Sequence, residues 1–437
     1  MTIATTTKEI LHSITTSKRH FIILLLGFSS GLPAALTAST LQAWFTQTGI
    51  SLQTIGAVTL LVFPYSFRFL WASIFDHYAI PGFDRRRGWL YVTQIGLIFA
   101  IAAMAFLTPL QTFKLYSLYV PWLMVLGFIT AFLSSSQDIA IGAYQIEFLP
   151  KEEQGLGAAI YGIGWRVSSI ISGAIALLLA KYWGWRETYL FMASLMGIGI
   201  IATYIAPNAA YVGKASKTIV QATIIPLKEF FQRYGLKTAF IFLLIIITYK
   251  AGDALALALN TTFLLRQMGF DLATVGLVNK TVSIISSILG GVIAGIFITR
   301  MSLYRGLMIF GLIQGFANLG YALLAYWGKS LFLLVLTAFL ENFCSGLGSI
   351  ALVAMIMALC NIRFTATHFA VLSAVAFIPR TIVGPIAAPM VEALGWVQFF
   401  IVCTVISMPT LLFVYLNKNT LLKLRTHEEI GQVDFDN

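Results

Sequence analysis

The octet GISLQTIG at residues 49–56 recurs as GFDLATVG at residues 269–276, an offset of 220 residues. Each octet follows an apolar stretch that contains a run of small residues, so the first apolar stretch is the counterpart of a later one. Self-similarity at a fixed offset is typical of a chain built from two related halves. The octet pair therefore predicts an internal duplication and marks the first apolar stretch as part of it.

Further matches keep the same order in both halves. A single octet can match by chance, but a series of matches in one order is much harder to obtain that way. We therefore predict two parallel six-helix pseudo-repeats. The matching elements are Arg87-Gly88 with Arg305-Gly306, TAFL 130–133 with TAFL 337–340, Arg166 with Arg380, and Gly184-Trp185 with Gly395-Trp396.

The composition places the chain in a lipid bilayer. Hydrophobic residues make up 59% of the 437 residues, charged residues only 10%, and the mean hydropathy is +0.87. Soluble domains carry about 25% charged residues, so a soluble globular chain is excluded. Because a membrane-spanning helix needs about 20 mainly apolar residues, we predict an all-α integral membrane protein with twelve transmembrane helices. They are expected at 21–46, 54–75, 88–107, 117–147, 156–180, 188–206, 238–263, 273–298, 306–327, 331–360, 368–390 and 399–416.

The longest internal polar break separates the two halves. We expect a six-helix bundle in residues 1–206, a cytoplasmic linker in 207–237, and a second six-helix bundle with a short cytoplasmic tail in 238–437. Within the linker, residues 219–233 are mildly amphipathic, although Pro226 limits helical continuity. The pattern favours a short interfacial helix there, with a plain tether as the alternative.

Basic residues are distributed unevenly among the predicted loops. Of the 28 Lys and Arg residues, 18 fall in the loops and tails on the side of the N-terminus and 5 in the opposite loops. Cytoplasmic loops carry such an excess, so both termini are expected in the cytoplasm. The net charge of +11 therefore reflects membrane topology rather than a nucleic-acid partner, whose basic residues would gather on one face or tail. A cleavable signal peptide beginning near Lys18 is the rival interpretation, and the repeat argues against it.

The sequence contains no motif of a zinc hydrolase, a P-loop enzyme or a metal site. HExxH and P-loop patterns are missing, and Cys344, Cys360 and Cys403 match no metal-ligand spacing. No catalytic residue, metal or cofactor is therefore expected. A membrane-embedded transferase or hydrolase is the alternative from another class, but the loop-borne acid, histidine or metal cluster of such an enzyme is not visible in the sequence.

Eight charged residues lie inside the predicted spans, where a charge costs about 3 kcal/mol even on the lenient insertion scale. Such residues usually face a bundle interior or an aqueous cavity. Arg166, Lys250, Glu341 and Arg380 each fall about 10 to 12 residues into their spans, roughly 15–18 Å deep. Parallel-repeat transporters bind substrate at that level between their halves. The other four are Arg68, Asp138, Asp253 and Lys280.

The eight charges sum to +2 when every acid is ionised, which favours an anionic ligand. Arg166 and Arg380 are the leading candidates for anion contact, because a guanidinium can donate two parallel hydrogen bonds to a carboxylate. Lys250, Arg68 and Lys280 are the other basic candidates. The alternative is that these side chains form ion pairs between helices and do not touch substrate.

A proton-coupling residue would have to be a buried carboxylate, since no histidine lies in the middle of a span. Glu341, Asp253 and Asp138 are the choices. Glu341 ranks first because its own helix carries no cation within four residues, whereas Lys250 shares a helix face with Asp253 and can pair with it. The alternative for Glu341 is a permanent ion pair with an arginine of another helix.

Polar and aromatic side chains in the spans are candidates for holding sugar groups through amide hydrogen bonds and ring stacking. For each of them the alternative is an interfacial anchor or a hydrogen bond between helices. These substrate-binding candidates are Gln42, Trp44, Tyr65, Gln137, Tyr249, Asn279, Gln314, Asn318 and Asn342.

Two resemblances extend these predictions. The loop from Asp76 to the basic residues Arg85, Arg86 and Arg87 resembles the loop after the second helix in the major facilitator superfamily, which implies that these four residues latch the inward side. Almost the whole chain resembles the AmpG family of muropeptide permeases. The stretches that carry this second resemblance are LGFSSGLP (26–33), LQAWF (41–45), FLW (69–71), RRRGWL (85–90), SQDIAI (136–141), LPKEEQGLGAA (149–159), YKAGDALA (249–256), TTFLLRQMGF (261–270), VNKT (278–281) and LENFCSGLG (340–348).

The AmpG resemblance implies the major facilitator fold and proton-driven import of N-acetylglucosaminyl-1,6-anhydro-N-acetylmuramic acid, with or without its peptide, across the bacterial inner membrane. It also implies a role in peptidoglycan recycling and, where the inducible system exists, in β-lactamase induction. The sequence departs from the family at Gly142, where an acidic residue often follows QDIAI. We expect a monomer in the bilayer, driven by the proton gradient, and the alternative cargo is another anionic conjugate, such as a different glycopeptide or a coenzyme A ester.

Overall fold

The structure is a computed structural model that describes residues 17–115, 118–150, 153–208, 219–298, 300–361, 365–422 and 424. Its contacts divide the chain into two compact units. Each unit is built mainly from one half of the chain and takes one short segment from the other half. Unit 1 comprises Met1–Thr54, Leu61–Ala215 and Asp271–Leu277, and unit 2 comprises Ile55–Leu60, Ser216–Phe270 and Val278–Asn437.

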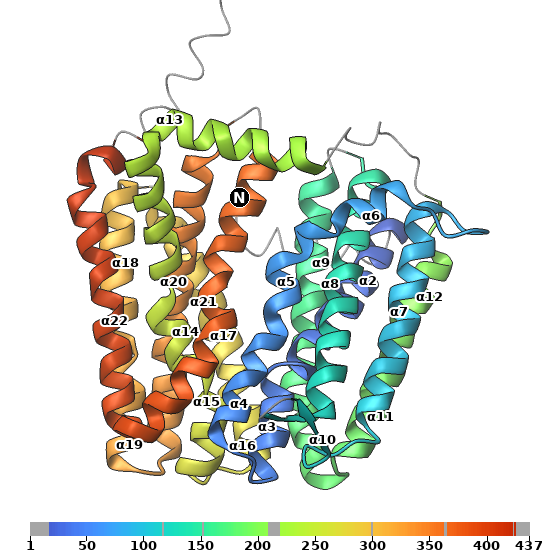
Figure 1. The fold of residues 1–437 in the computed structure, drawn as a ribbon, viewed down its shortest axis with the longest axis horizontal. Coiled ribbons are helices and arrows are strands. Elements are labelled where there is room, and N and C mark those ends of the chain that lie inside the picture. Colours follow the sequence, from blue (N-terminus) through green and yellow to red (C-terminus); the bar gives the residue numbers. More distant parts are fainter. Residues whose placement is uncertain are drawn as a thin grey trace, which may run out of the picture. The chain divides into compact units, whose positions relative to one another are not determined.

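Unit 1 consists of helices and one short hairpin (Figure 1). In the hairpin, β1 (Thr112–Leu115) pairs antiparallel with β2 (Leu118–Pro121), and Thr112 lies opposite Pro121. The helical elements of the unit are α2 (Lys18–Leu36), α3 (Ser39–Gln47), α5 (Phe63–Phe67), η2 (Arg68–Leu70), α6 (Ala72–His77), α7 (Arg85–Met104), α8 (Trp122–Phe148), α9 (Gln154–Ile170), η4 (Ile171–Ile175), α10 (Ala176–Tyr182), α11 (Trp185–Leu195), α12 (Gly197–Ile205) and α16 (Leu272–Thr274).

The residues described for unit 2 are almost entirely helical. Three elements, α4 (Leu52–Ala57), η1 (Val58–Val62) and η6 (Val275–Lys280), cross a boundary between the units. The helices that belong to unit 2 alone are α13 (Ile219–Thr248), α14 (Ala251–Ala258), α15 (Asn260–Thr262), η5 (Phe263–Gln267), α17 (Thr281–Ile298), α18 (Leu303–Ala317), α19 (Leu319–Trp327), α20 (Leu331–Leu359), α21 (Thr365–Leu394) and α22 (Trp396–Leu416).

Ten helices in the described part of the chain are long and apolar enough to cross a membrane. The longest, Val371–Leu416, covers most of the expected span at 368–390 and all of the one at 399–416. Gly395 (φ +77°) separates these two spans as α21 and α22. The expected span at 54–75 is broken into short helical pieces instead, and Pro64, which has no N–H to donate, lies among them. When these two regions are counted, all twelve predicted spans are helical over most of their length.

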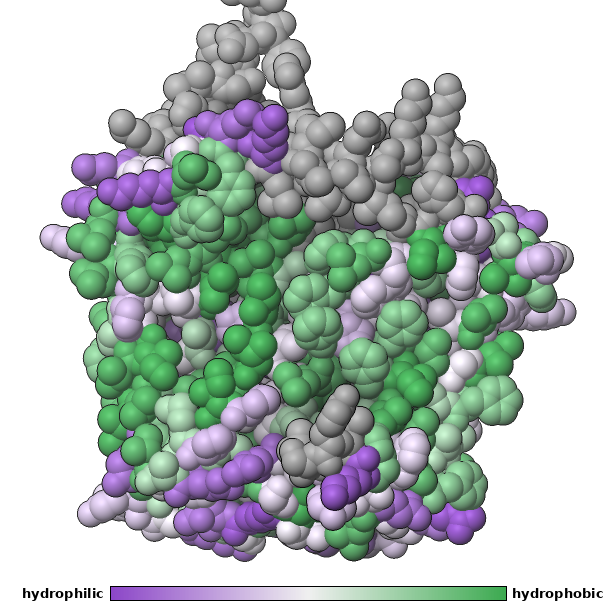
Figure 2. Space-filling model, in the orientation of Figure 1, coloured by the Kyte–Doolittle hydropathy of each residue, from purple (hydrophilic) through white to green (hydrophobic). Residues whose placement is uncertain are grey.

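Large apolar side chains are exposed along the helices of both units. Phe99 and Ile201 in unit 1 are 70% and 58% exposed, and Val405 and Leu412 in unit 2 are 59% and 55% exposed. On the face drawn in Figure 2, hydrophobic residues cover the middle of the helices and hydrophilic residues gather at their ends. Lipid contact accounts for apolar exposure of this extent. The prediction of an integral membrane protein is therefore confirmed.

The two sequence repeats adopt matching backbone turns. Gly49 and Gly269, which open the two octets, have φ angles of +75° and +66°. Gly184 and Gly395, which precede the two repeated tryptophans, have φ angles of +96° and +77° and immediately precede α11 and α22. Glycine adopts this left-handed region without the steric penalty of a side chain. The duplication predicted from the octets is therefore visible in the backbone.

The last glycine of each octet packs directly against another helix. A Cβ added to Gly56 would overlap the carbonyl oxygen of Gly384 on α21, and one added to Gly276 would come within 2.6 Å of the Ala174 carbonyl oxygen on η4. The Asp271 carboxylate in the second octet also pairs with Lys181 on α10. These contacts explain why residues 55–60 belong to unit 2 and residues 271–277 to unit 1.

Helix α13 covers the residues for which a linker helix was expected. It begins at Ile219 and passes through Pro226, so the expectation that Pro226 would interrupt it was wrong. The break lies at Gly235, whose φ of +73° and ψ of 155° are not helical. In Figure 1 the first part of α13 crosses the ends of the other helices of unit 2, and the second part runs along them. Its location at a membrane interface remains a prediction.

Candidate functional site

Three elements of unit 1, α2, α9 and η2, bring side chains to the surroundings of Asp138 on α8. Ser30 on α2 donates a short hydrogen bond to Asp138 Oδ1, and its hydroxyl also lies 2.6 Å from the Tyr161 hydroxyl on α9. Arg68 Nη1, on η2, lies 3.6 Å from Asp138 Oδ2. The Asp138 side chain is 14% exposed and that of Arg68 51% exposed, so the ion pair is open on one side. We call these four residues the Asp138 cluster.

Glycines hold α2 against α9 at this cluster. A Cβ added to Gly27 would overlap the carbonyl oxygen of Tyr161, and one added to Gly31 would overlap the carbonyl oxygen of Trp165. The two backbones therefore touch, which is how small residues pack membrane helices. Because Ser30 lies between these two glycines, the LGFSSGLP segment positions its hydroxyl beside Tyr161 and Asp138.

A second cluster lies in unit 2, where α13 ends and α14 begins. Lys250 Nζ donates to Asp253 Oδ2 at 3.3 Å, to the Ser345 carbonyl oxygen at 2.7 Å and to Ser345 Oγ at 2.9 Å. Lys250 is 5% exposed and Asp253 2% exposed. The predicted pairing of Lys250 with Asp253 is confirmed, and it uses the full donor capacity of the ammonium group.

Glu341 lies one helical turn before Ser345 on α20 and differs from Asp253 in its contacts. It is 1% exposed, and neither carboxylate oxygen has a hydrogen-bond partner among the described residues. The charges that act on it are Asp253, Lys250 and Arg380. A buried polar group normally has a partner, so this unpaired carboxylate is unusual. A role for Glu341 in proton coupling remains a prediction.

The two leading arginines lie in different units, Arg166 on α9 and Arg380 on α21. Both residues are exposed, and neither forms an ion pair with any described residue. The Arg380 guanidinium lies 5.8 Å from the centre of the Phe377 ring. Lys280 is half-buried at the end of η6. Both guanidinium groups therefore retain free donors, and their contact with an anion remains a prediction.

In unit 1 the predicted amide and aromatic residues pack within the helix bundle. Trp44 is 5% exposed and stacks on Trp185 with 5.3 Å between ring centroids. Gln137 Nε2 donates to Ser29 Oγ at 2.7 Å. Gln42 is 6% exposed and Tyr65 is half-buried. Contact of these four residues with substrate stays a prediction.

In unit 2 one of the predicted residues, Tyr249, is next to Lys250 in the chain, and another, Gln314, is joined to Tyr249 by a hydrogen bond. Tyr249 donates its hydroxyl to the Leu307 carbonyl oxygen at 3.0 Å, and Gln314 Nε2 donates to the Tyr249 carbonyl oxygen at 3.3 Å. Asn342 Nδ2 donates to Ser283 Oγ at 2.9 Å. Asn318 is fully buried, and neither polar atom of its amide has a partner in the described part of the chain. The side chain of Asn279 lies outside the described residues.

Among the predicted latch residues, Arg86 and Arg87 both form hydrogen bonds to other elements of unit 1. Its Nε and Nη2 donate to Glu147 Oε1 at 3.0 and 2.6 Å, and its Nη1 donates to the Phe75 carbonyl oxygen at 3.1 Å. Arg87 Nη1 donates to Asn208 Oδ1 at 2.8 Å. Arg87 Nε also donates to the Thr203 carbonyl oxygen on α12 at 3.2 Å. These bonds tie the start of α7 to α6, to α8 and to α12. Of the other two, Arg85 opens α7, and the Asp76 side chain lies outside the described residues.

Sequence reasoning missed the hydroxyl groups at both clusters. Ser30 contacts Asp138, which is 108 residues away in the chain, and Tyr161 contacts Ser30, which is 131 residues away. Ser345 contacts Lys250. A signal was present, because LGFSSGLP contains Ser30 and LENFCSGLG contains Ser345. Hydroxyl groups within an apolar span would have marked these two positions for attention.

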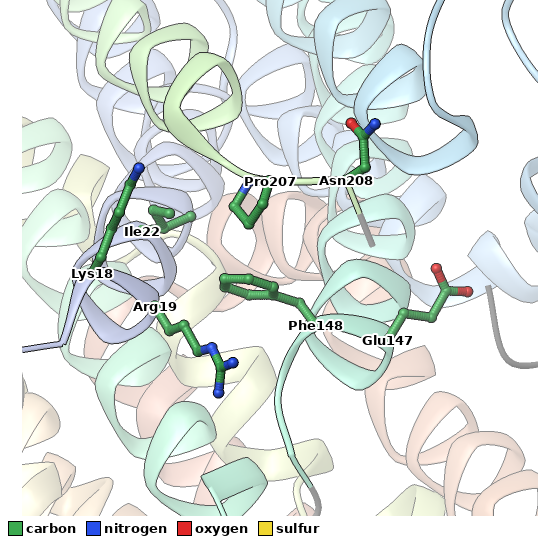
Figure 3. Close-up of a pocket in the computed structure, with 7 residues that line it drawn as sticks. All are labelled: Lys18, Arg19, Ile22, Glu147, Phe148, Pro207 and Asn208. Atoms are coloured by element: carbon green, nitrogen blue, oxygen red, sulfur yellow. The ribbon is translucent and has the colours of Figure 1, made fainter. Parts of the chain in front are cut away.

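A separate pocket of about 460 Å³ opens at one end of unit 1 (Figure 3). In Figure 3 the Phe148 ring extends toward α2, whereas the Glu147 carboxylate points away from it. Glu147 is nine residues from Asp138, about 13 Å along α8, so the pocket is distinct from the Asp138 cluster. The pocket is lined by Lys18, Arg19, Ile22, Glu147, Phe148, Pro207 and Asn208.

Comparisons with known proteins identify the family. The sequence profile of the Major Facilitator Superfamily matches residues 23–327. The anhydromuropeptide permease of Escherichia coli (strain K12) is 45% identical over 411 residues, which cover 94% of this chain and 82% of that protein. The chain belongs to the AmpG family of the major facilitator superfamily. Putative transporter AmpG 4 of Rickettsia felis is 30% identical over 412 residues, 92% of this chain and 97% of that protein.

Solved structures agree with this assignment at the level of the fold. A bacterial homologue of the human lysosomal transporter Spinster, in an inward-facing and unoccupied conformation, has a TM-score of 0.68 at 15% identity. The match covers 93% of this chain. That match spans 99% of the Spinster homologue. A D-xylose–proton symporter has a TM-score of 0.68 at 13% identity, over 91% of this chain and 96% of the symporter. The predicted major facilitator fold is therefore confirmed.

Proposed function

We propose that this protein imports anhydro-muropeptides across the bacterial inner membrane for peptidoglycan recycling, by alternating access of its two halves. The observation that carries the proposal is the 45% identity, over 94% of the chain, to a protein named for that substrate. The cargo is N-acetylglucosaminyl-1,6-anhydro-N-acetylmuramic acid, alone or with its stem peptide.

The exposed arginines are suited to the charge of this cargo. The stem peptide and the muramic acid carry carboxylates, and Arg166 and Arg380 have donors that no described residue occupies. A planar guanidinium can bind a carboxylate through two parallel hydrogen bonds. In this proposal Arg166 of unit 1 and Arg380 of unit 2 each bind a cargo carboxylate.

Glu341 is the proposed proton-coupling residue. Its carboxylate is buried and has no hydrogen-bond partner, whereas Asp253 accepts from Lys250 and Asp138 accepts from Ser30. Binding a proton removes the charge on Glu341 and turns one oxygen into a donor, which removes much of the penalty of its burial. Alternation between the two protonation states would then accompany alternation between inward and outward access.

The orientation in the membrane follows from the charges of the loops. Both termini are assigned to the cytoplasm because the predicted loops on that side hold 18 Lys and Arg residues and the opposite loops 5. The Arg86–Glu147 pair and the pocket at Lys18 then lie on the cytoplasmic side of unit 1. The octet turns at Gly49 and Gly269 lie on the opposite side.

Uptake of radiolabelled anhydro-muropeptide into inner-membrane vesicles with an imposed proton gradient tests the proposal. Vesicles containing the protein should accumulate the label, and a protonophore should abolish accumulation. Arg380→Lys should reduce uptake at least tenfold by removing the two-donor contact, while Arg186→Lys, at the start of α11, should transport normally. Uptake of an unrelated anionic conjugate in place of the muropeptide would overturn the substrate assignment.

A further inference from the structure

The amide of Asn318 lies at the same level of unit 2 as the carboxylate of Glu341. Two contacts set the alignment of their helices: Thr337 Oγ1 on α20 donates to the Gly320 carbonyl oxygen on α19 at 3.2 Å, and a Cβ added to Gly348 on α20 would overlap Gln314 Oε1 on α18. The segment formed by α18 and α19 therefore runs antiparallel to α20. Asn318 and Glu341 both fall between these contacts.

Helical spacing also directs the two side chains to the same interface. Glu341 follows Thr337 by four residues, and Thr337 points its hydroxyl at α19. Asn318 follows Gln314 by four residues, and Gln314 extends to Gly348 on α20. Residues four apart share a helix face. Glu341 and Asn318 therefore project from facing helices into the space between them.

Both side chains are unsatisfied at this interface. Asn318 is 0% and Glu341 1% exposed, and none of the four polar atoms (Asn318 Oδ1 and Nδ2, Glu341 Oε1 and Oε2) has a partner among the described residues. Leaving a buried polar atom unpaired destabilises a protein, and more so when the group is charged. Four unpaired polar atoms on facing helices point to a small polar ligand between them.

Two further polar side chains, Tyr321 on α19 and Asn260 on α15, continue from this site. Tyr321 lies three residues beyond Asn318, is fully buried, and accepts a hydrogen bond from Asn260 Nδ2 at 2.7 Å. The tyrosine hydroxyl thus keeps its own proton available for donation. Asn260 Oδ1 has no partner in the described residues. The charge of Glu341 acts on Tyr321, so the hydroxyl lies within its electrostatic reach.

We propose that Asn318 and Glu341 bind a water molecule between them, and that this water delivers the coupling proton to Glu341 from the Tyr321–Asn260 end of the unit. The inference rests on the proposed function, because it assigns a route to the proton that drives import. In the transfer, an O–H bond of a hydronium ion breaks and an O–H bond forms on Glu341. The hydronium becomes water and the carboxylate becomes neutral.

The groups around Glu341 are compatible with a proton that binds and leaves. Asp253 opposes its negative charge, whereas Lys250 and Arg380 favour it, and Tyr321 and Cys344 are the titratable neighbours without a formal charge. Lys250 is held by Asp253 and Ser345 and donates no hydrogen bond to Glu341. The Asn318 amide is therefore positioned, from the facing helix, to orient water at the carboxylate in either protonation state.

Asn318→Leu tests the site, because leucine fills a similar volume without polar atoms. Proton-driven accumulation of labelled anhydro-muropeptide should fall at least tenfold, whereas counterflow without a gradient should stay within twofold of wild type. Asn318→Ser, which keeps a hydroxyl and room for water, should recover most of the accumulation. Gln94→Leu removes an equally buried amide from unit 1 and should leave the pH profile of uptake unchanged.

Infrared difference spectra of the purified protein in lipid, recorded between acidic and alkaline buffer, separate this inference from the substrate assignment. The carbonyl band of protonated Glu341 should vanish in Glu341→Gln and shift to higher frequency in Asn318→Leu, because the carboxyl group loses a hydrogen bond. An unshifted band, or proton-driven uptake by Asn318→Leu with the wild-type rate and pH profile, would overturn the inference. Failure of every form of the protein to take up muropeptide, with the band shift present, would instead refute the function alone.

Discussion

Replacing Lys250 with methionine should destabilise the protein far more than replacing Lys250 and Asp253 together. The two groups are 5% and 2% exposed, and Lys250 Nζ lies 3.3 Å from Asp253 Oδ2. At an effective dielectric constant of about 20, the Coulomb attraction at this distance is about 5 kcal/mol. Desolvation of the two ions offsets most of it. The pair therefore contributes little overall, but one partner without the other is costly.

A double-mutant cycle measures this difference. Lys250→Met and Asp253→Leu should each lower the free energy of unfolding by about 3–5 kcal/mol, and the double variant should lie within about 1 kcal/mol of wild type. Denaturant titration of the four purified proteins in detergent provides the values. Lys237→Met, which removes an exposed lysine of α13, is the control and should change stability by less than about 0.5 kcal/mol. A Lys250→Met variant as stable as wild type, or a double variant with additive losses, would refute the argument.

Three further perturbations follow from contacts in the structure. Gly384→Ala should destabilise unit 2 by about 1–3 kcal/mol because its Cβ would strike the Gly56 carbonyl oxygen, whereas Gly295→Ala, with open space around it, should be neutral or stabilising; thermal unfolding compares the two. Arg86→Ala should cost about 3 kcal/mol because it leaves Glu147 unpaired, and Arg86→Lys should recover part of the loss in the same assay. Asp271→Asn should change stability by at most about 1 kcal/mol, because its ion pair with Lys181 is exposed. Hydrogen bonds from Lys181 and Thr274 hold the pKa of Asp271 below its usual value, so the pair contributes above about pH 4 and is lost on further acidification; unfolding of both forms across acidic pH checks this window.

The fold was largely predictable because its determinants repeat along the chain. The octets at 49–56 and 269–276 identified two halves, and the structure gives both copies the same glycine turn, at Gly49 and Gly269. Apolar stretches about 20 residues long located the helices. The interruption of the span at 54–75 was missed, since hydropathy reports only that a stretch is apolar and not how Pro64 and its neighbours bend it.

The site was predictable only in part, because its partners come from distant positions. Spacing within one helix correctly paired Lys250 with Asp253, three residues apart. Ser30 and Asp138 are 108 residues apart, and no pattern in the sequence relates them. The relation of Asn318 to Glu341 likewise depends on the alignment of two antiparallel helices, which contacts of Thr337 with Gly320 and of Gln314 with Gly348 determine.

Accumulation of labelled anhydro-muropeptide in proteoliposomes that contain only the purified protein tests the central claim most directly. With an inward proton gradient, wild-type protein should raise the internal concentration above the external one, and a protonophore should return the two to equality. Glu341→Gln should equilibrate the substrate without accumulating it. Accumulation by Glu341→Gln that still collapses with the protonophore, or wild-type uptake indifferent to the gradient, would contradict proton coupling through Glu341.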